Sequence, residues 1–221
     1  MREYILEKVR NTPRHFNFGG IDVEQVDKTP EDIDVQKILS VIEKYFPRHY
    51  FQNLDKVRIE HLEEFDERDV TAVYQDGVFY ITNKQQSEED LLDDVVHEFA
   101  HHIESLYTQE IYGDHAIQKE FLKKREQLKF ELRSEGYGTE DYDFRNLKFD
   151  ERLDDFLYKR VGKTMLRMVT SGLFIRPYGS VSLREYFATG FEAYYLGKQE
   201  KLQKISPVLY SRINEIHKLN N

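Results

Sequence analysis

Residues 97–101 read His-Glu-Phe-Ala-His, and this short run holds side chains that could do chemistry together. Two histidines four positions apart on a helix share one face, one turn from each other, so both imidazoles can reach one metal ion. Glu98 lies to the side of the first histidine, where it can accept a proton from a water on the ion without being a ligand. Zinc held this way activates water and polarises a peptide carbonyl. The motif therefore predicts a hydrolytic zinc site, with His97 and His101 as ligands and Glu98 as general base.

A catalytic zinc ion also needs a third protein ligand and one open coordination position. The chain has no cysteine, so this ligand must be a histidine or a carboxylate. Of the downstream histidines His102, His115 and His217, the first points off the shared face and the second lacks the HExxHxxGxxH spacing. A carboxylate on another helix is therefore favoured, and the candidates are Glu151, Asp154, Asp155, Glu185 and Glu192.

Glu185 stands out among these carboxylates because the segment 183–196 around it is mostly apolar. An acid on a helix that must be mostly buried needs a reason to be there, and Glu192 is the second choice. The alternative is a plain acid of the first helical turn, favoured by the helix dipole. Ala188 and Gly190 are expected to let this helix pack closely on the helix of the motif.

The elements that must position these residues can be predicted from local patterns. Ser87 followed by three acids predicts the start of a motif helix that runs to about Tyr107. Strands are expected at 56–62, 70–75 and 78–82, and Asp76-Gly77 between the last two is a strong hairpin signal. Residues 1–10 are expected to form a short helix or strand, and 11–30 a loop. Further helices are expected at 29–46, 116–135, 149–170, 183–196 and 199–219.

This order predicts a helix-rich α+β fold with a small antiparallel sheet. We expect one domain over 1–221. Within it lie an N-terminal helical and loop region (1–50), the hairpin with the HExxH helix (51–110), a helical insertion (111–172), and the third-ligand and C-terminal helices (173–221). The basic run at 123–125 is expected to be a solvated helix face.

Composition excludes several classes of function. The 32 basic and 41 acidic residues give a net charge of −9, which disfavours binding to nucleic-acid phosphates. No apolar run is long enough to span a membrane. The N-terminus MREYILEKVR has neither the apolar run nor the cleavage site of a secretory signal, so a cytoplasmic location or leaderless export is expected.

The motif and the segments far downstream of it resemble one known family. His97-Glu98-Phe99-Ala100-His101, then Tyr178-Gly179, then Glu185-Tyr186-Phe187-Ala188 with Phe191, is similar to the catalytic region of the anthrax lethal factor-like zinc metalloproteases. This group includes the clostridial Pro-Pro endopeptidases. In it a tyrosine precedes the third ligand by seven residues, and Tyr178 and Glu185 keep that spacing. Thr189 stands where the family often has an acid.

The resemblance implies a zincin-like fold and a zinc endopeptidase. His97, His101 and Glu185 would be the zinc ligands and Glu98 the general base. Tyr178 would stabilise the oxyanion or help to protonate the leaving amine. A strand beside the motif helix would pair with a peptide or protein substrate, and 78–82 is the candidate. Two alternatives stay open. One is a non-catalytic toxin-like or protein-interaction domain with a vestigial or structural zinc site; the other is a helical scaffold with an accidental HExxH.

Overall fold

The structure, a computed structural model, describes residues 13–63, 65 and 71–219, so the element expected at 1–10 lies outside the described residues. The chain divides into two compact units, one reaching His102 and the other running from Ile103 to Leu219. The division falls close to the expected start of the helical insertion at 111. In the described part of the chain, no helix is long and apolar enough to cross a membrane.

The first unit contains a five-stranded sheet with the order β1-β2-β3-β5-β4. The pairs β1–β2 and β4–β5 are antiparallel, whereas β2–β3 and β3–β5 are parallel. The sheet is therefore mixed, and the expectation of an antiparallel sheet was wrong. Its strands are β1 (Arg14–Phe18), β2 (Ile21–Gln25), β3 (Lys56–Ile59), β4 (Ala72–Gln75) and β5 (Val78–Ile81).

Two features of the sheet were not predicted: the β1–β2 hairpin and the parallel pairing of β2, β3 and β5. We expected residues 11–30 to form a loop because of their glycine pair and prolines, but Gly19 and Gly20 form the turn between β1 and β2, with φ values of 61° and 95°. The predicted hairpin at Asp76-Gly77 is confirmed, and both residues have the positive φ such a turn requires (49° and 83°). Parallel pairing joins strands across a long crossover, which leaves no local sequence signal.

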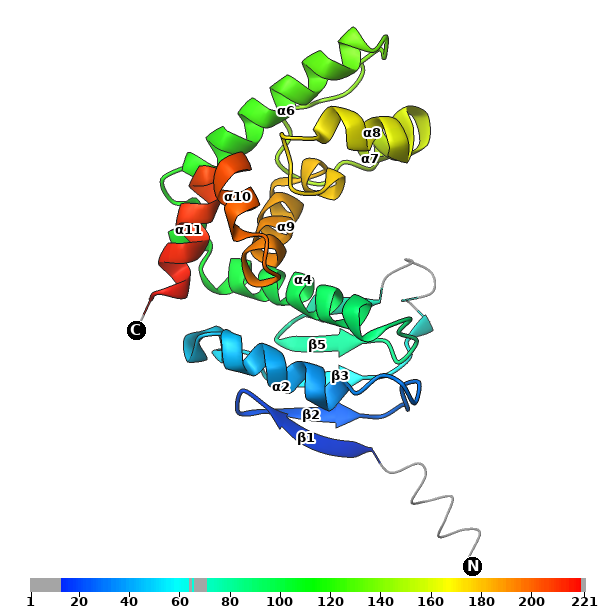
Figure 1. Cartoon of the computed structure of the whole chain (residues 1–221), viewed down its shortest axis with the longest axis vertical. Helices are drawn as coiled ribbons and strands as arrows, with labels where there is room; N and C mark the ends of the chain where they lie inside the picture. Colours follow the sequence, from blue (N-terminus) through cyan, green and yellow to red (C-terminus); the bar gives the residue numbers. More distant parts are fainter. Residues whose placement is uncertain (1–12, 64, 66–70, 220–221) are drawn as a thin grey trace, which may run out of the picture. The chain divides into compact units, whose positions relative to one another are not determined.

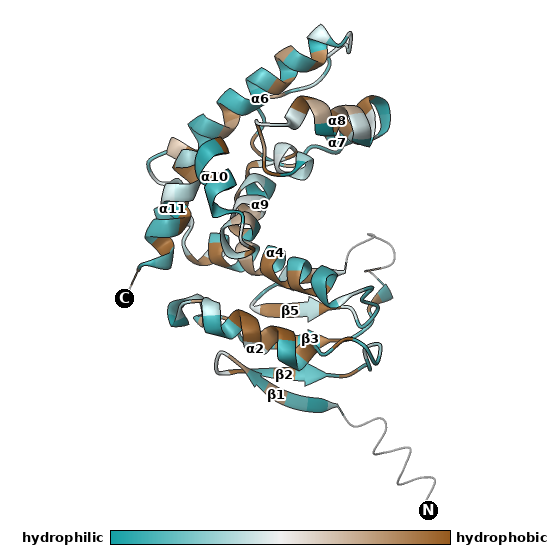
Figure 2. Cartoon of the chain, in the orientation of Figure 1, coloured by the Kyte–Doolittle hydropathy of each residue, from teal (hydrophilic) through white to brown (hydrophobic). Residues whose placement is uncertain are grey.

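Two helices pack on one face of this sheet: α2 (Val35–Tyr45) and α4 (Glu88–Leu106), whose last turn belongs to the second unit (Figure 1). Phe99 of α4 stacks on Phe79 of β5 with ring centroids 5.3 Å apart, and Phe46 at the end of α2 meets Phe99 edge-on at 4.8 Å. Figure 2 shows apolar residues along α2, β3 and β5, the elements that form this core. The chain has no tryptophan, and phenylalanine rings form the aromatic part of this core.

The start of α2 differs from the prediction. Thr29-Pro30 was expected to begin the helix, but the helix begins at Val35, because the Asp34 side chain accepts the Lys37 N–H at 3.0 Å. Residues 30–33 instead form a turn in which the Ile33 N–H donates to the Pro30 carbonyl.

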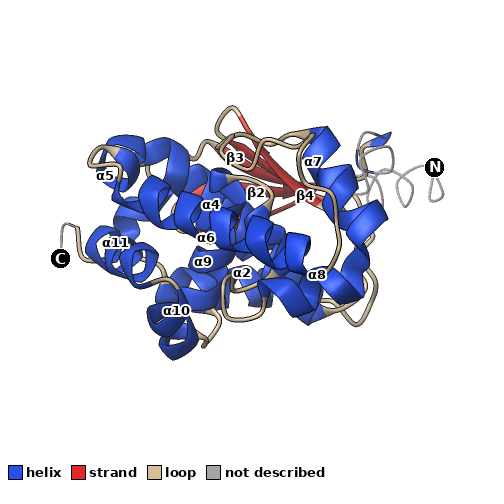
Figure 3. Ribbon diagram, turned by 90° about the horizontal axis from the view of Figure 1, so that it is seen from above, coloured by secondary structure: helices blue, strands red, loops and turns tan. Residues whose placement is uncertain are grey.

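The second unit is built from helices, and residues 103–219 contain no strand (Figure 3). The expected helices at 116–135 and 183–196 are confirmed. Two other expected helices are broken in the structure. The helices are α5 (Thr108–Tyr112), α6 (Ala116–Ser134), α7 (Glu151–Asp155), the π-helix η2 (Phe156–Gly162), α8 (Lys163–Thr170), the 3₁₀ helix η3 (Pro177–Ser180), α9 (Leu183–Tyr195), α10 (Gln199–Ile205) and α11 (Pro207–His217).

Each break has a backbone cause. The expected helix at 149–170 widens into the π-helix, which ends at Gly162 with φ of 83° before α8 begins. The expected helix at 199–219 stops before Pro207, which has no N–H to continue the ladder and instead begins α11.

Two packing expectations in this unit were also wrong. Gly190 was expected to let α9 approach the motif helix, but a Cβ at Gly190 would lie 2.3 Å from Leu209 Cδ2, so this glycine permits close packing on α11. The basic run at 123–125 was expected to be solvated, yet Arg125 is 0 % exposed and Lys124 is 9 % exposed. Their side chains lie inside the helical unit.

Candidate metal centre

The HExxH sequence lies in the middle of α4, as the sequence predicted. The helix begins with the expected cap, since the Ser87 hydroxyl accepts the Asp90 N–H at 3.0 Å. The first turn holds three acids next to the positive helix end. A stripe of buried apolar residues then fixes which face of α4 turns to the core: Leu91, Val95, Val96, Phe99 and Ile103.

The three polar residues of the motif come together on this helix. Single ligand atoms of His97, Glu98 and His101 lie within 4.8 Å of one another. The two imidazole rings are 4.8 Å apart between centroids and nearly perpendicular, at 89°. His101 is 6 % exposed, and His97 and Glu98 are half-buried. The two imidazoles are a pair of donors suited to zinc, and the Glu98 carboxylate lies beside them.

Strand β4 fixes the Glu98 carboxylate. The backbone N–H of Tyr74 donates to Glu98 Oε2 at 3.1 Å. One turn earlier on α4, the Thr71 hydroxyl donates to Asp94 Oδ2. Burial raises the pKa of the Asp94 carboxyl, and the nearby Glu98 charge acts in the same direction, against the Thr71 bond and His97. Thus α4 is tied to the residue before β4 and to the middle of β4, and the bond from Tyr74 orients the candidate base.

The strand expected to pair with substrate was wrong. Residues 78–81 form β5, which is bonded to β3 on one side and to β4 on the other. Because both of its hydrogen-bonding edges are used within the sheet, β5 cannot accept a further strand. In the strand order, β4 lies beyond β5 at the end of the sheet.

Tyr178 and Glu185 belong to the second unit, where consecutive elements position them. Tyr178 lies on η3 and is 40 % exposed. Glu185 is half-buried in the first turn of α9, and its N–H donates to the Ser182 hydroxyl at 3.1 Å. A Cβ at Gly179 would lie 2.6 Å from Thr189 Oγ1, so the absence of a side chain there lets η3 lie tightly on α9. The Thr189 hydroxyl in turn donates to the Glu185 carbonyl at 2.8 Å.

Two half-buried tyrosines of this unit, Tyr158 and Tyr112, are affected by the charge of Glu185. Burial raises the pKa of Tyr158 to about 12; the charges of Asp154 and Glu185 add to the rise, whereas Arg176 opposes it. Burial also raises the pKa of Tyr112, with smaller contributions from Glu104 and Glu185. Local patterns do not connect these two tyrosines with Glu185, because the π-helix and α5 bring them into the electrostatic range of α9 only in the folded chain.

The competing carboxylates have other partners or surroundings. Glu192 is 4 % exposed and pairs with Arg176 at 2.5 Å. Asp155 pairs with Lys159 at 2.6 Å, and Glu151 is exposed at the start of α7. Asp154 is half-buried, and burial raises the pKa of its carboxyl. The ion pair of Glu192 gives this buried acid a structural role and so favours Glu185 as the candidate ligand.

The three downstream histidines that were considered as ligands have other places in the fold. His102 is 1 % exposed, its Nε2 lies 2.9 Å from the Tyr50 carbonyl oxygen, and burial lowers the pKa of its ring. His115 has a left-handed backbone (φ 59°) at the start of α6. His217 Nδ1 lies 2.8 Å from the Tyr195 hydroxyl near the end of α11.

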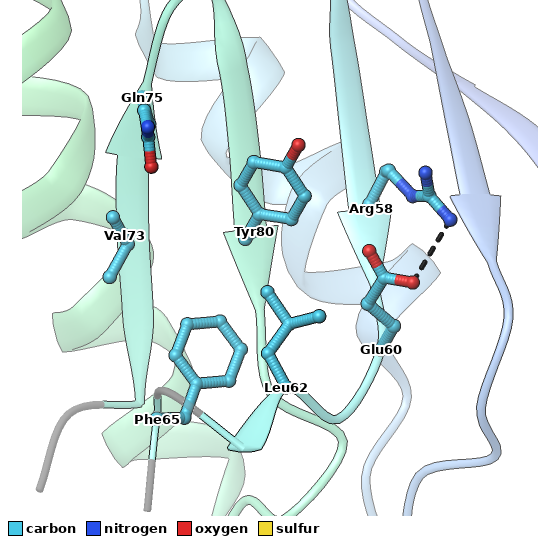
Figure 4. A pocket seen from close by; sticks show the side chains of 7 residues that line it. All are labelled: Arg58, Glu60, Leu62, Phe65, Val73, Gln75 and Tyr80. Atoms are coloured by element: carbon cyan, nitrogen blue, oxygen red, sulfur yellow. Dashed lines mark hydrogen bonds and ion pairs between the residues drawn. The ribbon is translucent and has the colours of Figure 1, made fainter. Parts of the chain in front are cut away.

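The first unit also has a cavity on its sheet. It measures about 330 Å³, and Figure 4 shows side chains of β3, β4 and β5 around it. Tyr80 alternates with the buried Phe79 and Ile81 along β5, so the cavity lies on the sheet face opposite α2 and α4. Two of its lining residues, Arg58 and Glu60, form an ion pair at 2.9 Å. The lining residues are Arg58, Glu60, Leu62, Phe65, Val73, Gln75 and Tyr80.

Comparison with known proteins gives no relative. No model of a known protein family matches the chain, and neither the curated proteins nor the solved structures include a significant match.

Proposed function

We propose that this chain is a zinc-dependent endopeptidase of the lethal factor-like type. The observation that carries the proposal is the cluster on α4, where ligand atoms of His97, Glu98 and His101 lie within 4.8 Å of one another. The bond from the Tyr74 N–H to Glu98 adds to it, because a carboxylate oriented by the neighbouring strand is suited to a base beside the ligands.

In this proposal His97, His101 and Glu185 hold the zinc ion. When bound, zinc supplies Lewis-acid chemistry: it acidifies water and polarises the carbonyl of the scissile peptide. Glu98 accepts a proton from the attacking water and later delivers a proton to the leaving nitrogen. The Tyr178 hydroxyl donates a hydrogen bond to the carbonyl oxygen as negative charge develops there. The exposure of Tyr178, at 40 %, leaves this side chain accessible to a substrate.

The proposed substrate is an extended peptide. Since β5 is enclosed by its neighbours, β4 is the strand at this end of the sheet that could add a substrate strand. The backbone N–H of Tyr74 donates to Glu98, so the edge of β4 at this residue lies next to the proposed base.

Metal analysis followed by a cleavage screen tests the proposal. The purified chain, freed of loosely bound ions, is expected to contain about one zinc ion, and the double variant His97→Ala/His101→Ala is expected to contain none. The zinc-loaded chain should then cleave members of a peptide library, and Glu98→Ala should retain zinc without cleavage. A chain that takes up no zinc after reloading would overturn the proposal. A chain that binds zinc and cleaves nothing would instead favour the non-catalytic domain with a structural zinc site.

A further inference from the structure

A buried arginine in the helical unit makes contacts that its local sequence does not suggest. Arg125 lies on α6 on the same face as Phe121 and Leu128, and all three are 0 % exposed. Burying a charged side chain is costly unless its donors are satisfied. Burial lowers the pKa of the Arg125 guanidinium to about 10, against the opposing effect of Asp143 and Asp150. Because burying this charge costs free energy, contacts that compensate for it are expected.

The guanidinium binds backbone carbonyls of two separate segments. Arg125 Nη1 donates to the carbonyls of Ser180 at 2.7 Å and Val181 at 3.1 Å. Its Nη2 donates to the Asp143 carbonyl at 3.3 Å. The rings of Phe121 and Phe144 lie 5.3 Å and 5.6 Å from the guanidinium carbon, in the range of cation–π contacts. The planar fork of arginine can bridge three carbonyls in this way, which the single ammonium of lysine cannot reproduce.

The carbonyls that Arg125 binds belong to the junction between η3 and α9. Ser180 is the last residue of η3, and Val181 is followed by Ser182, the N-cap of α9. A second bond fastens the same junction, because the Leu183 N–H donates to the Leu147 carbonyl at 2.8 Å. The junction is therefore held by α6 and by the loop at 143–147, both parts of the helical insertion. Tyr178 lies just before it and Glu185 just after it.

We propose that Arg125 is a positioning residue that, with the 143–147 loop, sets the backbone between Tyr178 and Glu185. This gives the helical insertion a role as the frame for these two side chains. The inference rests on the proposed function, since only there are Tyr178 and Glu185 assigned to substrate and metal. The neighbouring buried cation, Lys124, provides a contrast: its ammonium binds the carbonyls of Leu173 at 2.7 Å and Ile205 at 2.6 Å, outside the junction.

The test compares Arg125→Lys with Lys124→Met in the full chain. Hydrogen exchange is followed at the amides of 179–186 and, as an internal reference, at those of α11. Removing the fork should raise exchange at 179–186 about tenfold relative to α11, since the hydrogen bonds that restrain this backbone are lost. Arg125→Lys should also lower zinc affinity and kcat by about tenfold each, with KM changed less than about threefold. Lys124→Met should lower the melting temperature and leave these ratios unchanged.

Exchange at 179–186 that is unchanged in a folded Arg125→Lys variant would overturn the inference, as would equal changes in the Lys124→Met control. If Arg125→Lys does not fold, Phe144→Leu replaces it, because this change loosens only the packing over the guanidinium. A rise confined to 179–186 supports the inference, and an equal rise in α11 contradicts it. Failure of the proposed function looks different: the unaltered chain would then bind no zinc, while the exchange arm would still report on the junction.

Discussion

The Tyr74 N–H donates to Glu98 Oε2 at 3.1 Å, so the candidate base of the motif is held by the backbone of β4. The bond joins residues 24 positions apart and links the sheet to the middle of α4. A backbone donor cannot change its rotamer, and it therefore restrains the carboxylate more firmly than a side-chain partner would. Preorganisation of this kind is what a general base needs.

Replacing Glu98 should separate its two roles. Glu98→Gln keeps a side-chain oxygen that can accept the Tyr74 N–H, whereas Glu98→Ala removes it. Both variants should lose turnover by at least about a hundredfold, because neither can accept a proton. Only Glu98→Ala should also lose about 1 kcal/mol of unfolding free energy, from the hydrogen bond left unmade. Peptide cleavage and urea unfolding of the two variants measure these effects, and equal stabilities would contradict the structural role of the bond.

The choice of Glu185 over Glu192 can be tested by matched substitutions. Glu185→Gln should lower zinc affinity by at least about a hundredfold, since it removes a charged ligand. Glu192→Gln should leave zinc affinity within about threefold and lower stability, because it weakens the ion pair between this buried acid and the half-exposed Arg176. Competition with a chromogenic chelator measures the affinities. The reverse ranking would transfer the ligand role to Glu192.

The contact between Gly179 and Thr189 predicts a pair of compensating changes. Gly179→Ala places a methyl group 2.6 Å from Thr189 Oγ1, so η3 must shift from α9. The expected loss is about 1–3 kcal/mol of unfolding free energy, the usual cost of overpacking. Adding Thr189→Ala removes the obstructing hydroxyl and should restore part of it. Denaturant unfolding of the two single variants and the double variant forms the cycle; strictly additive losses would show that the two positions do not meet.

Tyr112 should make the fold sensitive to alkali. Burial raises the pKa of its hydroxyl, which also donates to Glu104 Oε1 at 2.5 Å. A phenol whose pKa is higher in the folded than in the unfolded chain stabilises the fold fully below the unfolded value of 10.0, and this contribution is lost as pH rises above it. The loss should be about 1.4 kcal/mol per pH unit.

Tyr112→Phe removes this titration and should flatten the fall of unfolding free energy above pH 10 by that slope. The comparison is made between the two chains at each pH, because lysines and other tyrosines titrate in the same range. Urea unfolding between pH 9 and 11 gives both curves. Parallel curves would contradict the prediction, because they would mean that the pKa of the Tyr112 hydroxyl is the same in the folded and the unfolded chain.

Local patterns in the sequence were sufficient for the elements whose causes are local. The cap at Ser87 and its acids defined α4, and Asp76-Gly77 defined the β4–β5 turn. The four-residue spacing of His97 and His101 placed both imidazoles together, because the helix repeat alone determines which residues share a face. The candidate cluster was thus predictable before any tertiary contact was known.

Tertiary structure decided the features that depend on distant pairing. The parallel order β2-β3-β5 encloses β5 and moves the available edge to β4, and strand order follows from crossovers that leave no local signal. In the same way, a basic run that is typical of a solvated face proved to bury Arg125 against the 180–181 backbone. The sequence by itself determined which side chains could hold a metal ion. Folding decided which distant groups meet them: the Tyr74 N–H donates to Glu98, and Arg125 binds the 180–181 backbone between Tyr178 and Glu185. These bonds join residues far apart in the chain, so no local pattern predicts them.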